Sequence, residues 1–344
     1  MSRIDAMGFL GEGVLWAVSV KVYLLYELRP IRLQFQSVRL SLNFSPSARL
    51  SSLVPPTAEL LKYSILGRDQ DDTVMQMEGK VAVVTGGAAG IGRASAQKLC
   101  ELGARVAILD RSAEAGQATI AALENSGYTA TYIPCDVTVE SEVKAAMAAI
   151  VARYGALHIL VSNAGIQRYG DVVTTTPELW NETMDVHVKG CFHVTKYAIP
   201  AMLASGGGAI VIVASVQSFT AINNSVAYVA AKHALLGMTR AIALDFASRN
   251  IRANCVCPGA IDTPMLRATA DRTGSPEKML ESIGRMHALG RIGRPQEVAN
   301  AIAFLASDDA SFITGTSLLV DGGLLVPTGG MGFQESGIGT GGKD

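Results

Sequence analysis

The chain has 344 residues, a formal net charge of −1 and no run rich in lysine or arginine, so nucleic acid is not an expected partner. No apolar stretch approaches the roughly 18 residues that a membrane-spanning helix needs, so no membrane partner is expected either. No Cys-x-x-C pair and no cysteine–histidine cluster at metal-ligand spacing occurs, which predicts no metal and a reducing, cytoplasmic location. The five cysteines are Cys100, Cys135, Cys191, Cys255 and Cys257.

Residues 1–76 differ in composition from the rest of the chain. Residues 28–58 contain four arginines, many serines and no acidic residue, a composition similar to that of an organelle transit peptide. The apolar residues of 31–44, however, alternate with period two and do not form the stripe of an amphipathic helix. We interpret 1–76 as an extension outside the folded core, with the natural protein starting at Met75 or Met77. Organelle targeting stays open as the alternative.

From Lys80 onward, short β-branched runs alternate with helical patterns, which is typical of buried parallel strands. The alternation predicts one doubly wound α/β domain of Rossmann type over residues 77–326, with helices on both faces of a parallel seven-stranded sheet. Residues 327–344 are expected to form a glycine-rich tail. The strands are expected at Val81–Thr85, Arg105–Asp110, Thr131–Cys135, His158–Ser162, Ala209–Ala214, Arg252–Cys257 and Ser317–Val320.

The first strand leads directly into a glycine-rich loop, T-G-G-A-A-G-I-G, which opens a helix. Gly86 permits the turn, and Gly90 and Gly92 let backbone and helix approach a pyrophosphate, whose charge the helix N-terminus attracts. The alternative, a plain strand-to-helix turn, does not explain why strand, glycines, helix and second strand fall in register. The loop therefore predicts a dinucleotide site that includes Gly86, Gly90, Ile91 and Gly92.

Asp110 closes the second strand, about twenty residues after the last glycine, where a carboxylate can accept hydrogen bonds from a ribose. The same charge repels a 2′-phosphate, so NAD is favoured as the cofactor. Arg111 beside it can accommodate that phosphate, so NADP is not excluded. A role for Asp110 as a helix N-cap before Ser112 is the structural alternative.

A third candidate site comprises Ser215, Tyr228 and Lys232. Tyr228 and Lys232 are four residues apart and share a helix face. A phenol is a poor base at neutral pH unless a nearby positive charge stabilises its phenolate, and Lys232 can supply that charge. Ser215, at the end of an apolar strand, can orient the oxygen whose proton moves. The Tyr-x-x-x-Lys spacing alone is weakly specific, and its weight comes from the upstream motifs.

From Met77 to about Leu325 these motifs, in this order, closely resemble the short-chain dehydrogenase/reductase family. The resemblance implies an oxidoreductase that transfers hydride between nicotinamide and a carbon bearing a hydroxyl or carbonyl. It implies that Ser215, Tyr228 and Lys232 are catalytic, and that Lys232 also binds the nicotinamide ribose. The family usually forms tetramers, so a homotetramer is expected.

The resemblance also implies the remaining cofactor contacts. Asp136–Val137 would contact adenine, S-N-A-G matches the segment that supports the sheet beside the cofactor, and P-G-A-I-D-T matches the turn that holds the nicotinamide carboxamide. The residues implied are Asp136, Val137, Asn163, Ala164, Gly165, Tyr228, Lys232, Pro258, Gly259, Ile261 and Thr263.

One departure from the family pattern is His187, in M-D-V-H-V-K-G, where the family usually has a catalytic asparagine within a helix. In the family that residue's main-chain carbonyl holds a water of the proton relay, and a histidine keeps the carbonyl. His187 is therefore a catalytic candidate with two interpretations: a neutral replacement at a position used through its backbone, or a ring that titrates near neutrality and tunes proton transfer.

The substrate is the least determined feature. S-V-Q-S, A-Y-V-A-A-K-H-A-L-L-G and N-C-V-C-P-G-A-I-D-T-P-M resemble aldose 1-dehydrogenases of the glucose and aldohexose type, which implies oxidation of an anomeric hydroxyl. Besides Ser215 and Tyr228, the candidate contacts are Gln167 and Gln217, with Arg168 and Asn223 as further polar residues. All four lie in expected loops, where solvent exposure is the alternative.

Two other functions stay open. One is the same chemistry on another alcohol or ketone, such as a cyclic diol, a steroid or a 3-oxoacyl thioester. The other is a non-catalytic dinucleotide-binding protein, against which the complete set of Ser215, Tyr228 and Lys232 argues. Residues 264–294 follow the nicotinamide turn and are expected to form a lid over the substrate.

Overall fold

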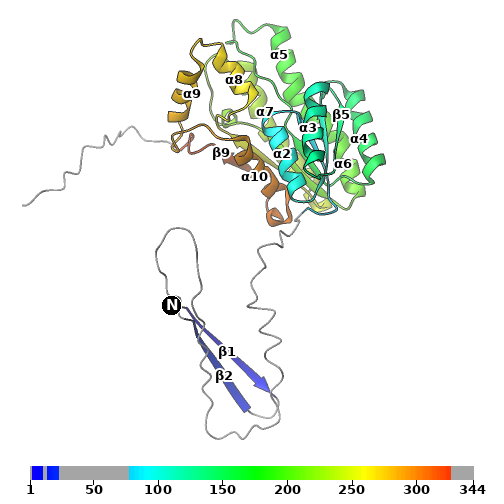
Figure 1. Cartoon of the computed structure of the whole chain (residues 1–344), viewed down its shortest axis with the longest axis vertical. Helices are drawn as coiled ribbons and strands as arrows, with labels where there is room; N and C mark the ends of the chain where they lie inside the picture. The colour runs from blue at the N-terminus through cyan, green and yellow to red at the C-terminus, as the bar shows by residue number, and fades with distance from the viewer. Residues whose placement is uncertain (1, 11–13, 23–76, 327–344) are drawn as a thin grey trace, which may run out of the picture. The chain divides into compact units, whose positions relative to one another are not determined.

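The computed structural model describes residues 2–10, 14–22 and 77–326, and the chain divides into two units, residues 1–72 and 73–344. In the first unit, β1 (Ser2–Leu10) pairs antiparallel with β2 (Val14–Val22) (Figure 1). The period-two pattern of 31–44 and the glycine-rich tail of 327–344 lie outside the described residues.

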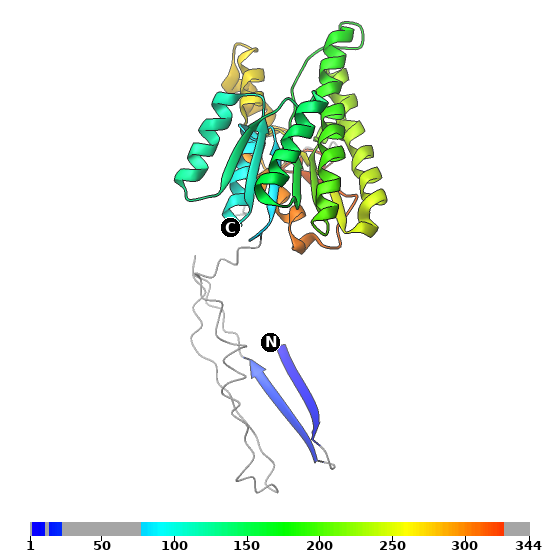
Figure 2. The same cartoon turned by 90° about the vertical axis from the view of Figure 1, so that its right-hand side faces the viewer.

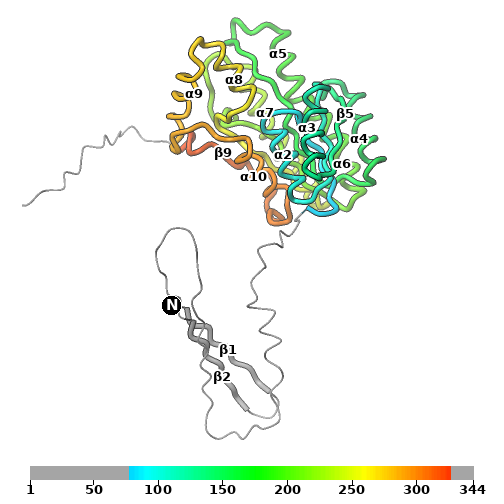
Figure 3. The backbone as a smooth tube through the Cα atoms, in the orientation of Figure 1, coloured from blue at the N-terminus to red at the C-terminus, as the bar shows by residue number. Residues whose placement is uncertain are grey.

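The second unit contains a parallel seven-stranded sheet with the strand order β5-β4-β3-β6-β7-β8-β9. The seven predicted strands are confirmed: three have the expected bounds, and the ends of the other four differ from the expected ones by at most one residue, because pairing with the neighbouring strand sets each end. The backbone path through the sheet can be followed in Figure 3. The strands are β3 (Val81–Thr85), β4 (Arg105–Asp110), β5 (Ala130–Pro134), β6 (Ile159–Ser162), β7 (Gly208–Val213), β8 (Ile251–Pro258) and β9 (Ser317–Val320).

Helices cover both faces of this sheet (Figure 2). Alternate residues of β3 point into different cores: Val81 and Val83 belong to one apolar cluster, and Ala82 and Val84 to the other. The strands are therefore apolar throughout rather than alternating. One face carries α4 (Glu140–Tyr154), α6 (Gly190–Ala204) and α7 (Val226–Phe246), and the other carries α2 (Gly90–Glu101), α3 (Ala113–Asn125) and α10 (Pro295–Ala306).

The strand order reverses between β3 and β6, which are neighbours at the centre of the sheet. In doubly wound sheets the crevice outside the carboxyl ends of the strands at such a reversal is where ligands bind. Thr85, Ser162, Ala214 and Pro258 end or follow four neighbouring strands and meet at this edge. The confirmed fold thus brings together segments that are far apart in the sequence.

The segment expected to form a lid contains two helices, α8 (Pro264–Asp271) and α9 (Pro276–Arg285), which lie together after β8 (Figure 1). The segment between β6 and α6 contains α5 (Pro177–Met184), which continues into a π-helical turn, η1 (Asp185–Lys189). Within the part of the chain that the structure describes, no helix is both long and apolar enough to cross a membrane.

Asn254 on β8 fixes the approach to the edge strand. Its side chain is fully buried, donates to the Ile313 carbonyl (2.8 Å) and accepts from the Thr316 N–H (3.1 Å). We expect Asn254→Ala to lower the free energy of unfolding by about 2–4 kcal/mol, because two buried backbone groups lose their partners. Urea titration measures this. Asn300→Ala, on the exposed face of α10, is the control and should change stability by less than about 0.5 kcal/mol. Equal stabilities of the two variants would contradict this account.

Candidate active site

The glycine-rich loop is shaped for close approach of a ligand backbone. A Cβ at Gly92 would lie 2.0 Å from the Gly86 carbonyl oxygen, and Gly90 has φ +52°, so larger residues are excluded from both positions. Helix α2 begins at Gly90 with no side-chain cap from the described residues and no acidic residue in its first turn. Its free N–H groups and its dipole therefore suit an anion, and a pyrophosphate fits this loop.

Asp110 lies at the carboxyl end of β4, where it holds the loop. One carboxylate oxygen accepts from the Ala88 N–H (3.1 Å), and the other accepts from the Ser112 N–H (3.0 Å). Its alternative role as an N-cap is wrong, because Ser112 occupies the N-cap position of α3. The negative charge of Asp110 thus sits beside the loop, at the position expected for ribose recognition.

Asn163 joins the turn after β6 to the glycine loop. Its side-chain amide donates to the carbonyls of Thr85 (3.0 Å) and Gly86 (3.1 Å). In return the Thr85 hydroxyl accepts from the N–H groups of Asn163 (2.9 Å) and Ala164 (3.0 Å). Sequence reasoning missed Thr85, although its place at the end of a buried strand, before the loop, could have suggested it.

The segments expected at the two ends of the cofactor are also fixed by hydrogen bonds. Asp136 accepts from the Thr138 N–H (2.9 Å), and the Val137 carbonyl accepts from Nδ1 of the buried His193 (2.9 Å). At the other end Thr263 caps α8, and its methyl group would lie 3.2 Å from a Cβ at Gly90. The turn that begins at Pro258 therefore reaches the glycine loop in space.

The remaining residues expected to contact the cofactor line the same region. A Cβ at Gly165 would lie 2.7 Å from the ring of His187, so this position also requires glycine. Ile261 is buried and pairs with Gly293, while Gly259 directly follows β8. The sequence-predicted cofactor residues thus gather along one edge of the sheet.

Ser215, Tyr228 and Lys232 converge at the carboxyl end of β7. The buried Lys232 ammonium donates to the Val213 carbonyl (2.9 Å) and lies 5.4 Å from the centre of the Tyr228 ring. Ser215 is buried, its hydroxyl accepts from the Gln217 N–H (3.1 Å), and it lies close enough to the Tyr228 phenol to oppose the rise in that residue's pKa. The structure therefore brings the three predicted catalytic side chains to one place.

Burial dominates the electrostatics of this group. It raises the pKa of Tyr228 to about 12, against the opposing effect of the nearby Ser215 hydroxyl. It lowers the pKa of Lys232 to about 8, because a buried ammonium loses its hydration. In the protein without a bound ligand, the phenol is therefore protonated at neutral pH, and Lys232 alone does not turn it into a base.

His187 lies inside the π-helical turn η1, buried against Tyr228. Its ring meets that of Tyr228 edge-on, with centres 5.3 Å apart, and Nε2 lies 2.7 Å from the Ile166 carbonyl. Nδ1 has no partner among the described residues. Burial lowers the pKa of His187 to about 3, so the hypothesis of a ring that titrates near neutrality is not supported. The ring instead packs the 165–166 segment against Tyr228.

The polar candidates for substrate contact fall into different environments. Gln167 donates to the Ser225 hydroxyl (3.3 Å), and Arg168 forms an ion pair with Glu182 (2.6 Å). Gln217 is half-buried, and its side-chain oxygen has no partner among the described residues. Asn223, by contrast, is exposed. Gln217 is thus the residue of the four with an unsatisfied polar atom close to Ser215.

Tyr169 was not predicted from the sequence. Its hydroxyl shares a hydrogen bond with that of Thr269 on α8 (2.8 Å), and it lies close enough to Tyr228 to add to the rise in that residue's pKa. Its position between a loop and the lid follows only from the fold, so no sequence signal could have found it.

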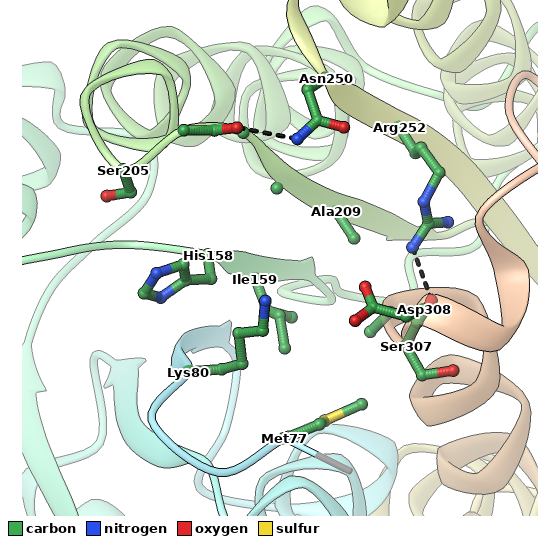
Figure 4. Close-up of a pocket in the computed structure, with 14 residues that line it drawn as sticks. Met77, Lys80, His158, Ile159, Ser205, Ala209, Asn250, Arg252, Ser307 and Asp308 are labelled. Carbon is green, nitrogen blue, oxygen red and sulfur yellow. Dashed lines mark hydrogen bonds between the residues drawn. The ribbon is translucent and has the colours of Figure 1, made fainter.

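A polar cavity of about 130 Å³ lies at the opposite, amino-terminal ends of the strands (Figure 4). Lys80, His158 and Arg252, near the starts of β3, β6 and β8, line it together with Asp308. Because the glycine loop and Tyr228 are at the carboxyl ends, this cavity does not belong to the candidate active site.

Comparison with known proteins agrees with the geometry of this site. A family model described as Enoyl-(Acyl carrier protein) reductase matches residues 86–325. The chain is 42% identical over 249 residues to a 2,5-dichloro-2,5-cyclohexadiene-1,4-diol dehydrogenase of Sphingobium indicum, covering 72% of this chain and 97% of that protein. It is 38% identical over 250 residues to a cyclohexanol dehydrogenase of Acinetobacter, covering 72% and 95%.

Among solved structures, the aldohexose dehydrogenase of Thermoplasma acidophilum in ligand-free form is 41% identical, with a TM-score of 0.69, covering 74% of this chain and 97% of that one. The fold and the matched motifs define a nicotinamide-dependent oxidoreductase that acts on CH–OH groups. The chain belongs to the short-chain dehydrogenase/reductase family.

The burial of His187 predicts a pH dependence of stability. Its pKa is about 3 in the folded protein against an ordinary 6.5, so the unfolded chain takes up the proton first as the pH falls. The stability that comes from the neutral ring is complete above pH 6.5 and is lost progressively toward pH 3. At pH 4.5 we expect wild type to have lost about 2–3 kcal/mol from this site, and His187→Asn to lack this loss.

Urea titrations at several pH values measure the difference. The exposed His233 is the control, and His233→Asn should leave the slope of stability against pH unchanged. A His187→Asn slope equal to that of wild type would show that the ring is not held neutral.

Proposed function

We propose that this protein is an NAD-dependent dehydrogenase of a secondary or anomeric hydroxyl, with catalysis by Ser215, Tyr228 and Lys232. The observation that carries the proposal is the convergence of these three side chains beside a glycine loop that suits a pyrophosphate. A non-catalytic dinucleotide-binding protein would not need a buried lysine set against a tyrosine, since burial of an ammonium is costly.

Each of the three residues has a distinct role. Tyr228 carries the proton of the substrate oxygen, and Ser215 orients that oxygen through its hydroxyl. Because its pKa is raised to about 12, Tyr228 is ready to donate a proton to a ketone, whereas oxidation requires its phenolate. Lys232, 5.4 Å from the ring centre, can stabilise that phenolate when it is charged. A bound nicotinamide would accept or supply the hydride.

His187 has a supporting role in this proposal. Its neutral ring holds the Ile166 carbonyl and packs on Tyr228, so it positions the catalytic phenol rather than moving protons itself. This corresponds to the interpretation in which histidine replaces the family's asparagine without adding a titrating group.

The cofactor preference rests on Asp110. Its carboxylate beside the glycine loop would accept hydrogen bonds from a ribose and repel a 2′-phosphate, which supports NAD over NADP. Asp136 and Val137 would lie at the adenine, and Thr263 at the carboxamide. Lys232 would hold the nicotinamide ribose.

The substrate we infer is a hydroxyl carried on a six-membered ring. The named relatives act on a cyclohexadiene diol and on cyclohexanol, and the structural neighbour is an aldohexose dehydrogenase. An aldose in its pyranose form and a cyclic alcohol present the same ring-borne hydroxyl. Gln217, with its unpartnered side-chain oxygen, and Gln167 are placed to contact further hydroxyls of such a ring.

We further infer a homotetramer, because large apolar side chains are exposed on two separate surfaces. Phe192 and Leu244 lie on α6 and α7, and Phe304, Phe312 and Leu319 lie on or near the edge strand β9. Residues 77–326 would be the catalytic unit of a cytoplasmic enzyme, and 1–76 an extension to it. Organelle targeting by that extension is the alternative.

Tyr228→Phe tests the assigned chemistry. We expect kcat to fall by about 100-fold to 10,000-fold, because the group that transfers the proton is lost, while the affinity for NADH stays within about threefold. Tyr197→Phe is the matched control: its hydroxyl bonds Glu140 on the surface, and its removal should leave kcat unchanged. Full turnover by Tyr228→Phe would overturn the assignment.

A substrate panel on the full chain tests reaction and cofactor together. Aldoses, cyclohexanols, cyclic diols, hydroxysteroids and a 3-hydroxyacyl thioester are each offered with NAD and with NADP, and reduction of the nicotinamide is followed at neutral and alkaline pH. We expect turnover of ring-borne hydroxyls with NAD, because a carboxylate at Asp110 opposes the 2′-phosphate. Activity confined to the thioester or to NADP would contradict the proposal. If cyclohexanols are oxidised and no sugar is, an aldose is rejected as the substrate.

A further inference from the structure

A buried histidine outside the predicted site connects the lid to the turn that begins at Pro258. His287 lies two residues after the end of α9 and is 4% exposed. Its Nε2 accepts from the Ala260 N–H (3.1 Å), and its Nδ1 donates to the Ile283 carbonyl at the end of α9 (2.9 Å). These two bonds together require the neutral ring with its hydrogen on Nδ1.

The surroundings of His287 leave it little freedom. A Cβ at Gly259 would lie 2.8 Å from Nε2, so glycine at this position lets the imidazole approach the backbone, and Gly322 lies in contact with the ring on another side. The turn is also held from the same side by backbone bonds, since the Gly293 N–H donates to the Ala260 carbonyl (2.8 Å). Both backbone groups of Ala260 are thus bound by the segment that returns from the lid.

Side-chain packing behind the turn is incomplete. A cavity of about 210 Å³ lies there, lined by Gly259, Ala260 and Ile261 on one side and by Leu289 and Val320 on others. Backbone hydrogen bonds hold the two ends of the turn beside this cavity, because the Gly259 N–H donates to the Val320 carbonyl (3.1 Å) and the Asp262 N–H donates to the Gly293 carbonyl (2.9 Å). Between them, the position of Ala260 depends on His287 and Gly293, which bind its N–H and its carbonyl.

We propose that His287 is a positioning residue that fixes the nicotinamide-binding turn and the base of the lid as one unit. The inference rests on the proposed dinucleotide function, in which this turn holds the nicotinamide carboxamide. The segment with the two lid helices begins after the turn, at Thr263, and comes back to it at His287. The imidazole therefore joins the end of this segment to the turn from which it started. Its loss would loosen the nicotinamide end of the site and leave the adenine end intact.

Three variants separate the two hydrogen bonds. His287→Leu removes both, and His287→Asn can retain the donor to Ile283 but not the acceptor for Ala260. His287→Gln places an amide oxygen near the former Nε2 and can retain that acceptor. His158→Leu is the matched control, because His158 Nδ1 accepts from a backbone N–H as well (Val81, 3.0 Å), but at the opposite end of the sheet.

The measurement compares two ligands on the full chain, NADH and ADP-ribose, which lacks the nicotinamide. We expect His287→Leu and His287→Asn to raise the Kd for NADH about tenfold, as the loss of one well-placed hydrogen bond would, and to leave the Kd for ADP-ribose within about twofold. His287→Gln should recover NADH binding to within about threefold of wild type. The His158 control should leave both affinities unchanged.

The outcomes are decisive in either direction. Unchanged NADH affinity in His287→Leu and His287→Asn, or equal weakening of NADH and ADP-ribose, would overturn the proposal, the second by showing a general structural role. If His287→Leu does not fold, the comparison of His287→Asn with His287→Gln decides. A wild-type protein that binds neither ligand would instead reject the proposed function itself.

Discussion

The close packing of two backbone turns, at the carboxyl ends of β3 and β6, is the constraint on which the rest of the site depends. Asn163 bonds two carbonyls of the glycine loop, and the Thr85 hydroxyl accepts two N–H groups in return. The glycine loop does not tolerate a Cβ at this contact: one at Gly86 would lie 2.9 Å from the Cα of Ala164. The contact sits where the strand order reverses, at the edge of the sheet where ligands bind in doubly wound folds.

Burial and neighbouring thiols together set the electrostatics around Lys232. Desolvation lowers the pKa of Lys232 to about 8, and the thiols of Cys191, Cys255 and Cys257 act in the opposite direction. Burial raises the pKa of Cys191 to about 11, whereas the hydrogen bond with Cys257 lowers the pKa of Cys255. The ammonium of Lys232 lies 5.4 Å from the centre of the Tyr228 ring, so its charge acts on that phenol.

Much of the fold and of the site could be predicted because the relevant signals are local. The seven strands follow from short apolar runs between helices, and Tyr228 and Lys232 share a face because of helix geometry alone. Other features depend on contacts between distant segments. His187 could titrate near neutrality as far as the sequence shows, and only its burial against Tyr228 excludes this. Tyr169 and His287 carry no motif, so their contacts with the lid were not predictable.

The sequence by itself therefore determined the class of fold, the glycine loop, the acidic residue at the end of the second strand and the three side chains that we propose to be catalytic. Each of these is encoded by spacing within a single strand, turn or helix. The tertiary structure decided the protonation of Tyr228 and His187 and the hydrogen bond between His287 and Ala260. It also left the side-chain oxygen of Gln217 without a partner among the described residues. Those properties depend on desolvation and on hydrogen-bond partners supplied by segments far away in the chain, which no local pattern specifies.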